Sequence, residues 1–325
     1  MGAAPLARVV RSGLEESVVV GHVAVCDANG RVLARAGDVD RPVYLRSCTK
    51  PLQAAVSLSV IGDDAIPSRE VAVMCASHNG EPVHLGAVRA VLERGGLGPD
   101  SLLTPPGYPL DPEERARSQH PNRLFHNCSG KHAGMVLACV GAGWDRATYP
   151  ARSNPLQRRI RSAVQRASGA RDLVIGVDGC GVPVHGMAMR HAATLFARLA
   201  KPQLLGALAP HALRATDAMR TEPYIVGGRR RLDSETMQVV DGIVVKEGAE
   251  GLVCAAHLDS GIGIAVKTAD GGSRGTGPAL LETLRALDLI DRAQLRSLAA
   301  HHRPVISGGD VPVGVVEPAL ELRRR

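Results

Sequence analysis

The sequence has 325 residues and is poor in several features that define common protein classes. Aromatic residues make up only 2%, which argues against the stacking surfaces that bind single-stranded nucleic acid. The seven cysteines include no C-x-x-C pair, so we expect free or metal-bound thiols in a reducing cytoplasm. No apolar run approaches the roughly 20 residues that cross a bilayer, and no signal-peptide pattern is present. We therefore expect neither nucleic acid nor a membrane as a partner.

Sequence motifs of several enzyme families are also missing. Gly130-Lys131 resembles the end of a phosphate-binding loop, but Phe125 stands where that loop needs its first glycine. The Gly-x-Gly at residues 261–263 lacks the third glycine of a dinucleotide-binding loop. Neither the zinc-protease pattern H-E-x-x-H nor the nucleophile elbow G-x-S-x-G occurs. Nucleotide-dependent enzymes, zincins and α/β-hydrolases are therefore set aside.

The length and composition indicate a globular chain with a sizeable core. Hydrophobic residues reach 45%, and with so few aromatics the core must consist of Ala, Val and Leu with some Met. The formal charge is +7, with basic residues scattered along the chain apart from two short arginine runs. A mild positive balance of this kind fits an anionic or zwitterionic small substrate.

Hydrophobic periodicity predicts a mixture of strands and helices. Runs at 17–26 and 31–36 flank Asn29-Gly30, a strong hairpin signal. Runs at 239–246, 251–256 and 261–267 are separated by turns and predict an antiparallel meander. Further strands are expected at 43–45, 173–177 (buried) and 311–316, and helices at 47–58, 83–93, 129–140, 154–167, 185–199, 204–219, 278–287 and 292–301. We expect residues 1–325 to form one α/β domain, with an antiparallel sheet and flanking helices in layers.

Ser47 and Lys50 stand three residues apart where a strand-like run gives way to a helical one. Residues i and i+3 share a helix face, so the hydroxyl and the amine can meet. A serine becomes a good nucleophile when a neighbouring base accepts its proton, and a lysine can be that base once its pKa falls toward neutrality. The S-x-x-K spacing is typical of serine β-lactamases and penicillin-binding proteins. The alternative is an ordinary helix start with Ser47 as N-cap.

Three other clusters each allow a functional and a structural interpretation. Residues 77–79 form an S-x-N sequence after an apolar run, or a simple turn. Lys267 ends a strand-like run, where it is either a site residue or an exposed lysine. Cys128 and Lys131 repeat the i, i+3 spacing, and with Cys180 they form either a functional cluster or buried core thiols.

Together, five motifs of this sequence resemble those of the Rhizobium etli-type L-asparaginases over nearly the whole chain. In chain order they are R-S-C-T-K-P at 46–51, S-H-N-G-E at 77–81, N-C-S-G-K-H at 127–132, D-G-C-G at 178–181 and G-I-G-I-A-V-K at 261–267. The resemblance implies a fold related to serine β-lactamases and glutaminases, which agrees with the S-x-x-K interpretation.

The resemblance also implies catalytic and metal-binding roles. Ser47 with Lys50, and Ser77 with Lys267, match two Ser–Lys pairs of the family. Which serine attacks the substrate stays open. The residues that match a zinc site completed by water are Cys128, Lys131 and Cys180.

The residues that match the family's substrate pocket are Arg46, His132, Asp178 and Cys254. Asp178 is suited to hold the α-ammonium group of an amino acid. The resemblance thus implies an asparaginase that converts L-asparagine to L-aspartate and ammonia, with Zn²⁺ as cofactor and a homodimer as its assembly. The alternatives are a glutaminase or broader amidase on the same scaffold, and a non-catalytic zinc-thiolate binding protein.

Overall fold

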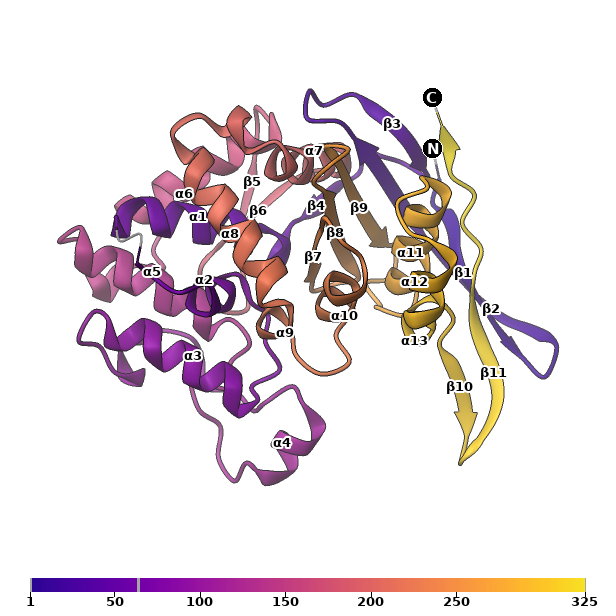
Figure 1. Cartoon of the computed structure of the whole chain (residues 1–325), viewed down its shortest axis with the longest axis horizontal. Helices are drawn as coiled ribbons and strands as arrows, with labels where there is room; N and C mark the ends of the chain where they lie inside the picture. The colour runs from indigo at the N-terminus through magenta and orange to yellow at the C-terminus, as the bar shows by residue number, and fades with distance from the viewer. Residues whose placement is uncertain (1, 63–64, 325) are drawn as a thin grey trace.

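A large antiparallel sheet forms one half of the molecule and a layer of helices the other (Figure 1). The computed structural model describes residues 2–62 and 65–324. Within those residues the large sheet has nine strands, in the order β10-β11-β1-β2-β9-β8-β7, with β3 on β2 and β12 on β3. In chain order these strands are β1 (Ala4–Arg11), β2 (Leu14–Cys26), β3 (Val32–Ala36), β7 (Ile243–Gly248), β8 (Leu252–His257), β9 (Ile262–Thr268), β10 (Val305–Gly308), β11 (Val311–Pro318) and β12 (Arg323–Arg324).

Helices gather beside the sheet and on its two faces (Figure 1). Those of the helical layer are α1 (Lys50–Ile61), α2 (Ser68–Cys75), α3 (Pro82–Glu93), α4 (Pro112–Arg117), α5 (Ser129–Gly141), α6 (Pro155–Ser168), α8 (Ala209–Thr221) and α9 (Pro223–Val226). Those nearer the sheet are α7 (Met189–Ala200), α10 (Leu232–Val239), α11 (Thr276–Ala286), α12 (Arg292–Ser297) and α13 (Ala299–His302). None of the helices in the described part of the chain is long and apolar enough to cross a membrane.

Strand β9 shows how the two faces of the sheet are covered. Gly263 lies so close to the backbone of α7 that a side chain there would clash with Ala193, which explains the glycine. Thr268 points to the opposite face, because side chains alternate along a strand, and it lies against Gly275 at the start of α11. Helices α7 and α11 therefore cover opposite faces of the sheet.

A second, small sheet connects the helical layer to the candidate site. It consists of β4 (Pro42–Tyr44), β6 (Pro183–Ala188) and β5 (Val174–Val177), with β6 in the middle. Beyond the end of β4, Leu45 N donates to the carbonyl of His185 in β6 at 2.9 Å. This bond fixes the chain immediately before residues 46–50, so β6 positions the S-x-x-K turn.

The structure confirms the antiparallel sheet with flanking helices, the hairpin of β2 and β3, and the meander of β7, β8 and β9. Several boundaries were wrong. The strand expected at 173–177 covers Val174–Val177 and is an edge strand with Val177 72% exposed, because it pairs on only one side. Residues 183–188 are a strand and not part of a helix; as the central strand it is buried on both faces and shows no period of two. The helix expected at 292–301 is broken at Leu298 into α12 and α13.

Candidate active site

The turn between β4 and α1 carries the first predicted residues. Arg46 has a positive φ of 47°, a left-handed conformation that costs a non-glycine residue about 1–2 kcal/mol. Its Nε donates to Asp178 Oδ1 at 2.7 Å, and this charge-assisted hydrogen bond offsets the cost. Ser47 follows in a short 3₁₀ helix and is partly buried, and Lys50 begins α1 three residues later. The contact between Arg46 and Asp178 thus links this turn to the turn between β5 and β6.

Lys50 is fully buried at the centre of the cluster. Its Nζ lies 2.5 Å from the carbonyl of Ala76, 3.5 Å from that of Asn127 and 2.8 Å from Ser77 Oγ. Burial lowers the pKa of Lys50 to about 8, and the cations Lys131 and Lys246 act in the same direction. A neutral amine has two N–H donors and one lone pair. With the two donors on the two carbonyls, the lone pair is left for the hydroxyl proton of Ser77.

Ser77 is held in place through its backbone. Its N–H donates to the carbonyl of Val226 at 2.9 Å, and its carbonyl accepts from Arg231 at 3.0 Å. Arg231 is fixed in turn by Glu247, 2.9 Å away on β7. The neighbouring His78 Nε2 lies 2.8 Å from Ser129 Oγ, which ties this segment to the start of α5. The Ser77 hydroxyl is therefore presented to Lys50 by contacts with three separate elements.

The second lysine near this centre is Lys246 on β7, which the sequence did not single out. Its side chain is fully buried, and Nζ lies 2.5 Å from Asp233 Oδ2. Although burial opposes the charge of Asp233, Lys246 and Arg231 hold the pKa of that carboxyl well below its usual range. Lys246 is among the cations that lower the pKa of Lys50. A buried ion pair thus lies next to the catalytic candidates.

Lys267 is not paired with Ser77, in contrast to the expected arrangement. It lies on β9 opposite His22 and Leu252, and its Nζ donates to the carbonyl of Thr268 at 2.7 Å. Its pKa is lowered, mainly by partial burial. Sheet order places β9 two strands away from β7, with β8 between them, so Lys267 cannot replace Lys246. One feature of the sequence could have indicated a buried lysine at position 246: Lys246 directly follows the apolar residues 243–245.

Cys128, Lys131 and Cys180 converge as expected. Cys128 is the N-cap residue of α5, Lys131 lies one turn later, and Cys180 lies in the turn between β5 and β6. Lys131 Nζ is 3.0 Å from Cys180 Sγ. A hydrogen bond from Cys180 and the nearby lysines lower the pKa of Cys128 well below its ordinary value, and the same hydrogen bond raises that of Cys180. Burial opposes the charge of Lys131, yet the two thiols raise its pKa.

The donor set of this cluster fits a thiophilic metal only if the lysine takes part. Over residues 2–62 and 65–324, no group of three or more His, Cys, Asp and Glu side chains is arranged to hold a metal ion. Asp178 Oδ2 lies 3.8 Å from Cys180 Sγ. Two thiols and one amine do converge, and sulfur and nitrogen are the ligands that zinc prefers.

His132 offers a hydrogen-bond donor with no protein partner. The Tyr149 hydroxyl accepts from Leu103 N at 2.8 Å and lies 2.6 Å from His132 Nδ1. We assign the single hydroxyl proton of Tyr149 to the bond with Nδ1, and in that tautomer the neutral imidazole carries its own proton on Nε2. Burial lowers the pKa of His132 well below its ordinary value, so the ring stays neutral. Nε2 is buried and unpartnered within the described residues, which suits a group that binds a substrate acceptor.

Cys254 is placed differently from the other pocket candidates. It lies in the middle of β8, fully buried in the core beside Cys48, and burial together with Cys48 raises its pKa well above the ordinary value. Cys48 directly follows Ser47 in the chain, so Cys254 lies behind the candidate turn. The substrate-binding role that the resemblance implies for Cys254 stays a prediction.

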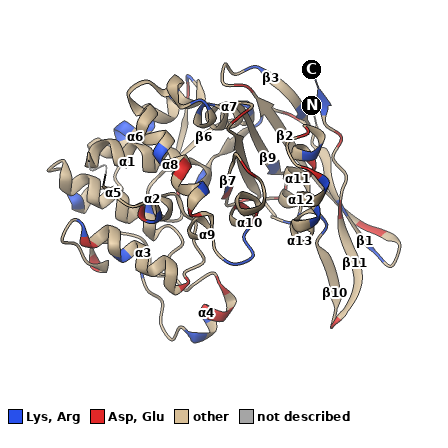
Figure 2. Cartoon of the chain, viewed as in Figure 1, with Lys and Arg blue, Asp and Glu red and all other residues tan. Residues whose placement is uncertain are grey.

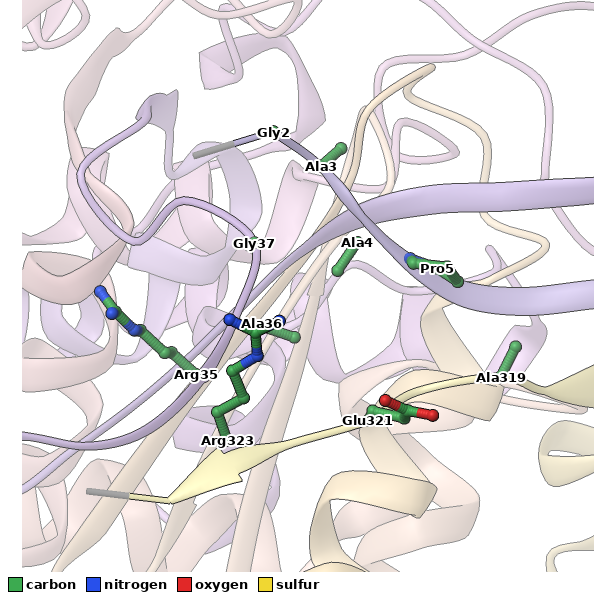
Figure 3. A pocket seen from close by; sticks show the side chains of 10 residues that line it. All are labelled: Gly2, Ala3, Ala4, Pro5, Arg35, Ala36, Gly37, Ala319, Glu321 and Arg323. Atoms are coloured by element: carbon green, nitrogen blue, oxygen red, sulfur yellow. The ribbon is translucent and has the colours of Figure 1, made fainter.

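The cavity shown in Figure 3 lies away from these residues, where the two ends of the chain meet. Its volume is about 490 Å³, and it lies between β1, β3 and the C-terminal strand. Its charged lining residues are Arg35, Arg323 and Glu321. No serine, lysine or cysteine lines it, so we assign the chemistry to the Lys50 centre instead.

The centre has the geometry of a hydrolase that activates a serine with a buried lysine. The chain belongs to the L-asparaginase II family, whose sequence model matches residues 7–318, and it is therefore an amidohydrolase. No curated protein matches the chain.

Solved structures similar to this chain share little sequence with it. A β-lactamase from Mycobacterium bovis has a TM-score of 0.46 and 16% identity, over 83% of this chain and 95% of that chain. Mglu in its glutamate form has a TM-score of 0.47 and 16% identity, over 82% of this chain and 60% of that one. A Bacillus subtilis glutaminase in covalent complex with 5-oxo-L-norleucine has a TM-score of 0.39 and 15% identity, over 82% of this chain and 88% of that chain. Likenesses this remote carry no argument about the substrate of this chain.

Proposed function

We propose that the protein is an L-asparaginase of the Rhizobium etli type, which hydrolyses the side-chain amide of L-asparagine to L-aspartate and ammonia. The observation that carries the proposal is the contact of fully buried Lys50 with Ser77 Oγ at 2.8 Å. An amine with a pKa of about 8 is largely neutral at weakly alkaline pH and can accept a hydroxyl proton there.

The proposed reaction is a two-step acyl transfer. Lys50 Nζ takes the proton of a serine hydroxyl as Oγ forms a bond to the amide carbon. The protonated lysine then gives this proton to the leaving nitrogen, the C–N bond breaks and ammonia departs. Water attacks the acyl-serine in the second step, with Lys50 again accepting a proton. The C–Oγ bond breaks as Lys50 gives this proton to Oγ, which releases aspartate and regenerates the serine and the neutral lysine.

Two serines can fill the nucleophile role. Ser77 Oγ contacts Lys50 directly but is only 3% exposed. Ser47 is less buried and shares a helix face with Lys50. If Ser47 attacks, Ser77 remains within reach of Lys50 as a proton relay. Turnover in Ser47→Ala and Ser77→Ala, followed by mass spectrometry of the trapped acyl-enzyme, assigns the roles.

Amino-acid recognition is proposed for the pair Arg46 and Asp178. A guanidinium and a carboxylate held 2.7 Å apart present opposite charges side by side, which is the complement of a zwitterionic α-carboxylate and α-ammonium. His132 Nε2–H adds a donor for a substrate oxygen. A pocket that fixes both α-groups sets the distance to the amide. One extra methylene costs roughly 1–3 kcal/mol, so we expect asparagine to be hydrolysed about a hundredfold faster than glutamine.

Zinc is proposed as the cofactor, with Cys128, Lys131 and Cys180 as its ligands. Bound there, zinc would supply a fixed positive charge and polarise groups next to the reacting centre. Zinc binding requires a neutral Lys131 and deprotonated thiols, so it is coupled to proton release. The proposal is supported by the 3.0 Å contact between Lys131 and Cys180.

An ammonia-release assay separates the proposed function from its alternatives. Release from asparagine but not glutamine supports an asparaginase, comparable rates on both amino acids indicate a glutaminase or broader amidase, and no release from either indicates a zinc-thiolate binding protein. The matched control for Lys50→Met is Lys201→Met, which removes a lysine that contacts the carbonyls of Leu258 and Asp259. Loss of activity in both variants would count against a specific role for Lys50.

We further propose that the protein works in the cytoplasm as a homodimer with L-asparagine as its small-molecule partner. Light scattering on purified protein tests the assembly: a mass near 68 kDa, twice the 34.1 kDa of one chain, is expected. A mass of one chain at all concentrations would refute the dimer.

A further inference from the structure

A second polar cavity, separate from the serine and lysine residues of the candidate active site, lies between α6 and the small sheet. Its volume is about 170 Å³, and its lining includes Arg152, Arg158, Arg161, Gln157 and His185. At roughly 30 Å³ per water molecule, this space equals about five to six waters. It can hold one compact ion or a small charged group, but not a nucleotide.

The lining carries strong positive charge that the protein does not neutralise. No carboxylate forms an ion pair with Arg152, Arg158 or Arg161 within residues 2–62 and 65–324. Helix α6 has four arginines and no acidic residue (Figure 2). Arg158 and Arg161 are three residues apart on one face of the helix, and Arg158 lies at the end of its first turn, near the positive N-terminal end. Arg152 is anchored at the opposite rim, where it donates to the carbonyl of Ile175 in β5.

Two buried side chains of the lining keep polar atoms without partners. His185 is 1% exposed and Gln157 is 3% exposed. His185 Nδ1 and Gln157 Oε1 have no hydrogen-bond partner among the described residues, although Gln157 Nε2 donates to the carbonyl of Tyr149 at 2.8 Å. A buried polar atom without a partner costs about 1–3 kcal/mol. A ligand that pairs with them would recover this cost.

The chemistry of these groups selects the ligand. Guanidinium groups form bidentate hydrogen bonds with carboxylates and phosphates. Gln157 Oε1 is an acceptor and needs a donor, which a carboxylate or sulfate lacks. Monohydrogen phosphate, and a singly protonated phosphate monoester, carry both acceptor oxygens and one P–O–H donor.

We propose that this cavity is a binding site for a phosphate group, held by Arg152, Arg158 and Arg161 and completed by Gln157 and His185. The proposal does not depend on the proposed function. The site lies one hydrogen bond behind the catalytic turn, because the carbonyl of His185 accepts from Leu45 N, directly before Arg46. Bound phosphate would therefore stabilise the backbone that positions this turn.

Calorimetric titration of the full chain with inorganic phosphate, in buffer of constant ionic strength, tests the proposal. The double variant Arg158→Gln/Arg161→Gln should bind phosphate at least about tenfold more weakly, because charged hydrogen bonds worth roughly 1.5–3 kcal/mol are lost. The matched control is Arg159→Gln on the same helix, whose guanidinium lies 5.2 Å from the Trp144 ring centre; its affinity should be unchanged. If the double variant and the control lose phosphate affinity equally, the effect comes from the overall charge of the protein, and the proposed site is refuted.

A second measurement on the wild-type protein does not depend on the variants folding. Burial, Arg161 and other nearby cations lower the pKa of His185 to about 4, so a bound anion should raise this pKa. NMR titration of the His185 ring carbons with and without phosphate measures the change. Sulfate should bind more weakly than phosphate because it cannot donate to Gln157. Glycerol phosphate that binds as well as inorganic phosphate would identify a monoester head group as the ligand, and selective binding of inorganic phosphate would identify the free ion. An unchanged His185 titration in saturating phosphate, or equal effects of phosphate and chloride, would refute the proposal.

Discussion

The pH dependence of turnover is the most direct test of Lys50 as the general base. The pKa of this lysine is lowered to about 8 from an ordinary value near 10.4, first by burial and then by Lys131 and Lys246. This difference means that the surroundings disfavour the ammonium form relative to the amine by about 3 kcal/mol. Only the amine accepts a proton, so activity should increase as the pH rises through 8.

The expected profile follows from the fraction of neutral lysine. At pH 6 about 1% of Lys50 is neutral, and at pH 9 about 90% is neutral, so kcat/KM should rise by roughly a hundredfold between these values. The buried imidazoles of His78 and His132 have pKa values far below this range and cannot produce the inflection. These two histidines are therefore excluded as the source of an inflection near 8, and its loss in Lys50→Met would assign it to Lys50.

The assay is ammonia release from asparagine at saturating and at low concentration, in overlapping buffers from pH 6 to 10. Lys50→Met should lower kcat by about 10²–10⁴-fold with no change in the far-ultraviolet circular dichroism spectrum. A profile that is flat between pH 6 and 9, or that falls with rising pH, would refute a lysine base at this centre.

The remaining predictions test the neighbouring groups. Lys246→Met should reduce the free energy of unfolding by about 3–5 kcal/mol in urea titrations, because Asp233 stays buried without its partner. Lys267→Met should cost under about 1 kcal/mol and keep turnover near that of wild type; a collapse of turnover would restore the pairing with Ser77 that the resemblance implied. Ser77→Ala should lower kcat by at least about a hundredfold without loss of stability, and unaltered kinetics would remove this serine from the mechanism. Purified wild-type protein should contain about one zinc per chain by elemental analysis, and Cys180→Ala should contain none; metal retained in the variant would exclude Cys180 as a ligand.

Local patterns in the sequence were sufficient for much of the architecture. The Asn29-Gly30 turn and the alternation around it predicted the hairpin of β2 and β3, because such a turn matches the twist of two adjacent strands. The apolar runs at 239–246, 251–256 and 261–267 predicted the meander, because short turns between successive runs favour antiparallel pairing. At β5 the strand was predicted but its burial was wrong, because the strand pairs on one side only. At β6 a helix was predicted, because a central strand buried on both faces lacks the period of two.

In the candidate site, too, local spacing could be predicted from the sequence, whereas contacts between separate elements could not. The i, i+3 spacing of Ser47 with Lys50, and of Cys128 with Lys131, is a property of a helical turn and can be read from the chain alone. The partner that Lys50 contacts is Ser77, 27 residues away, and this contact depends on how α1 packs against the end of α2. Spacing could not identify it, because contacts between elements are set by packing and not by local geometry.

The sequence by itself supplied the candidate residues: two serines with nucleophile-like surroundings, several lysines and a set of thiols that favour serine–lysine and zinc-thiolate chemistry. The sequence pointed to Lys267, and only the tertiary structure singled out Lys246. The register of β7, β8 and β9 places Lys246 against Asp233 and close enough to Lys50 to lower its pKa, and leaves Lys267 two strands away. The physical reason is that pKa values and ion pairs depend on burial and distance, and both are fixed by strand order and packing.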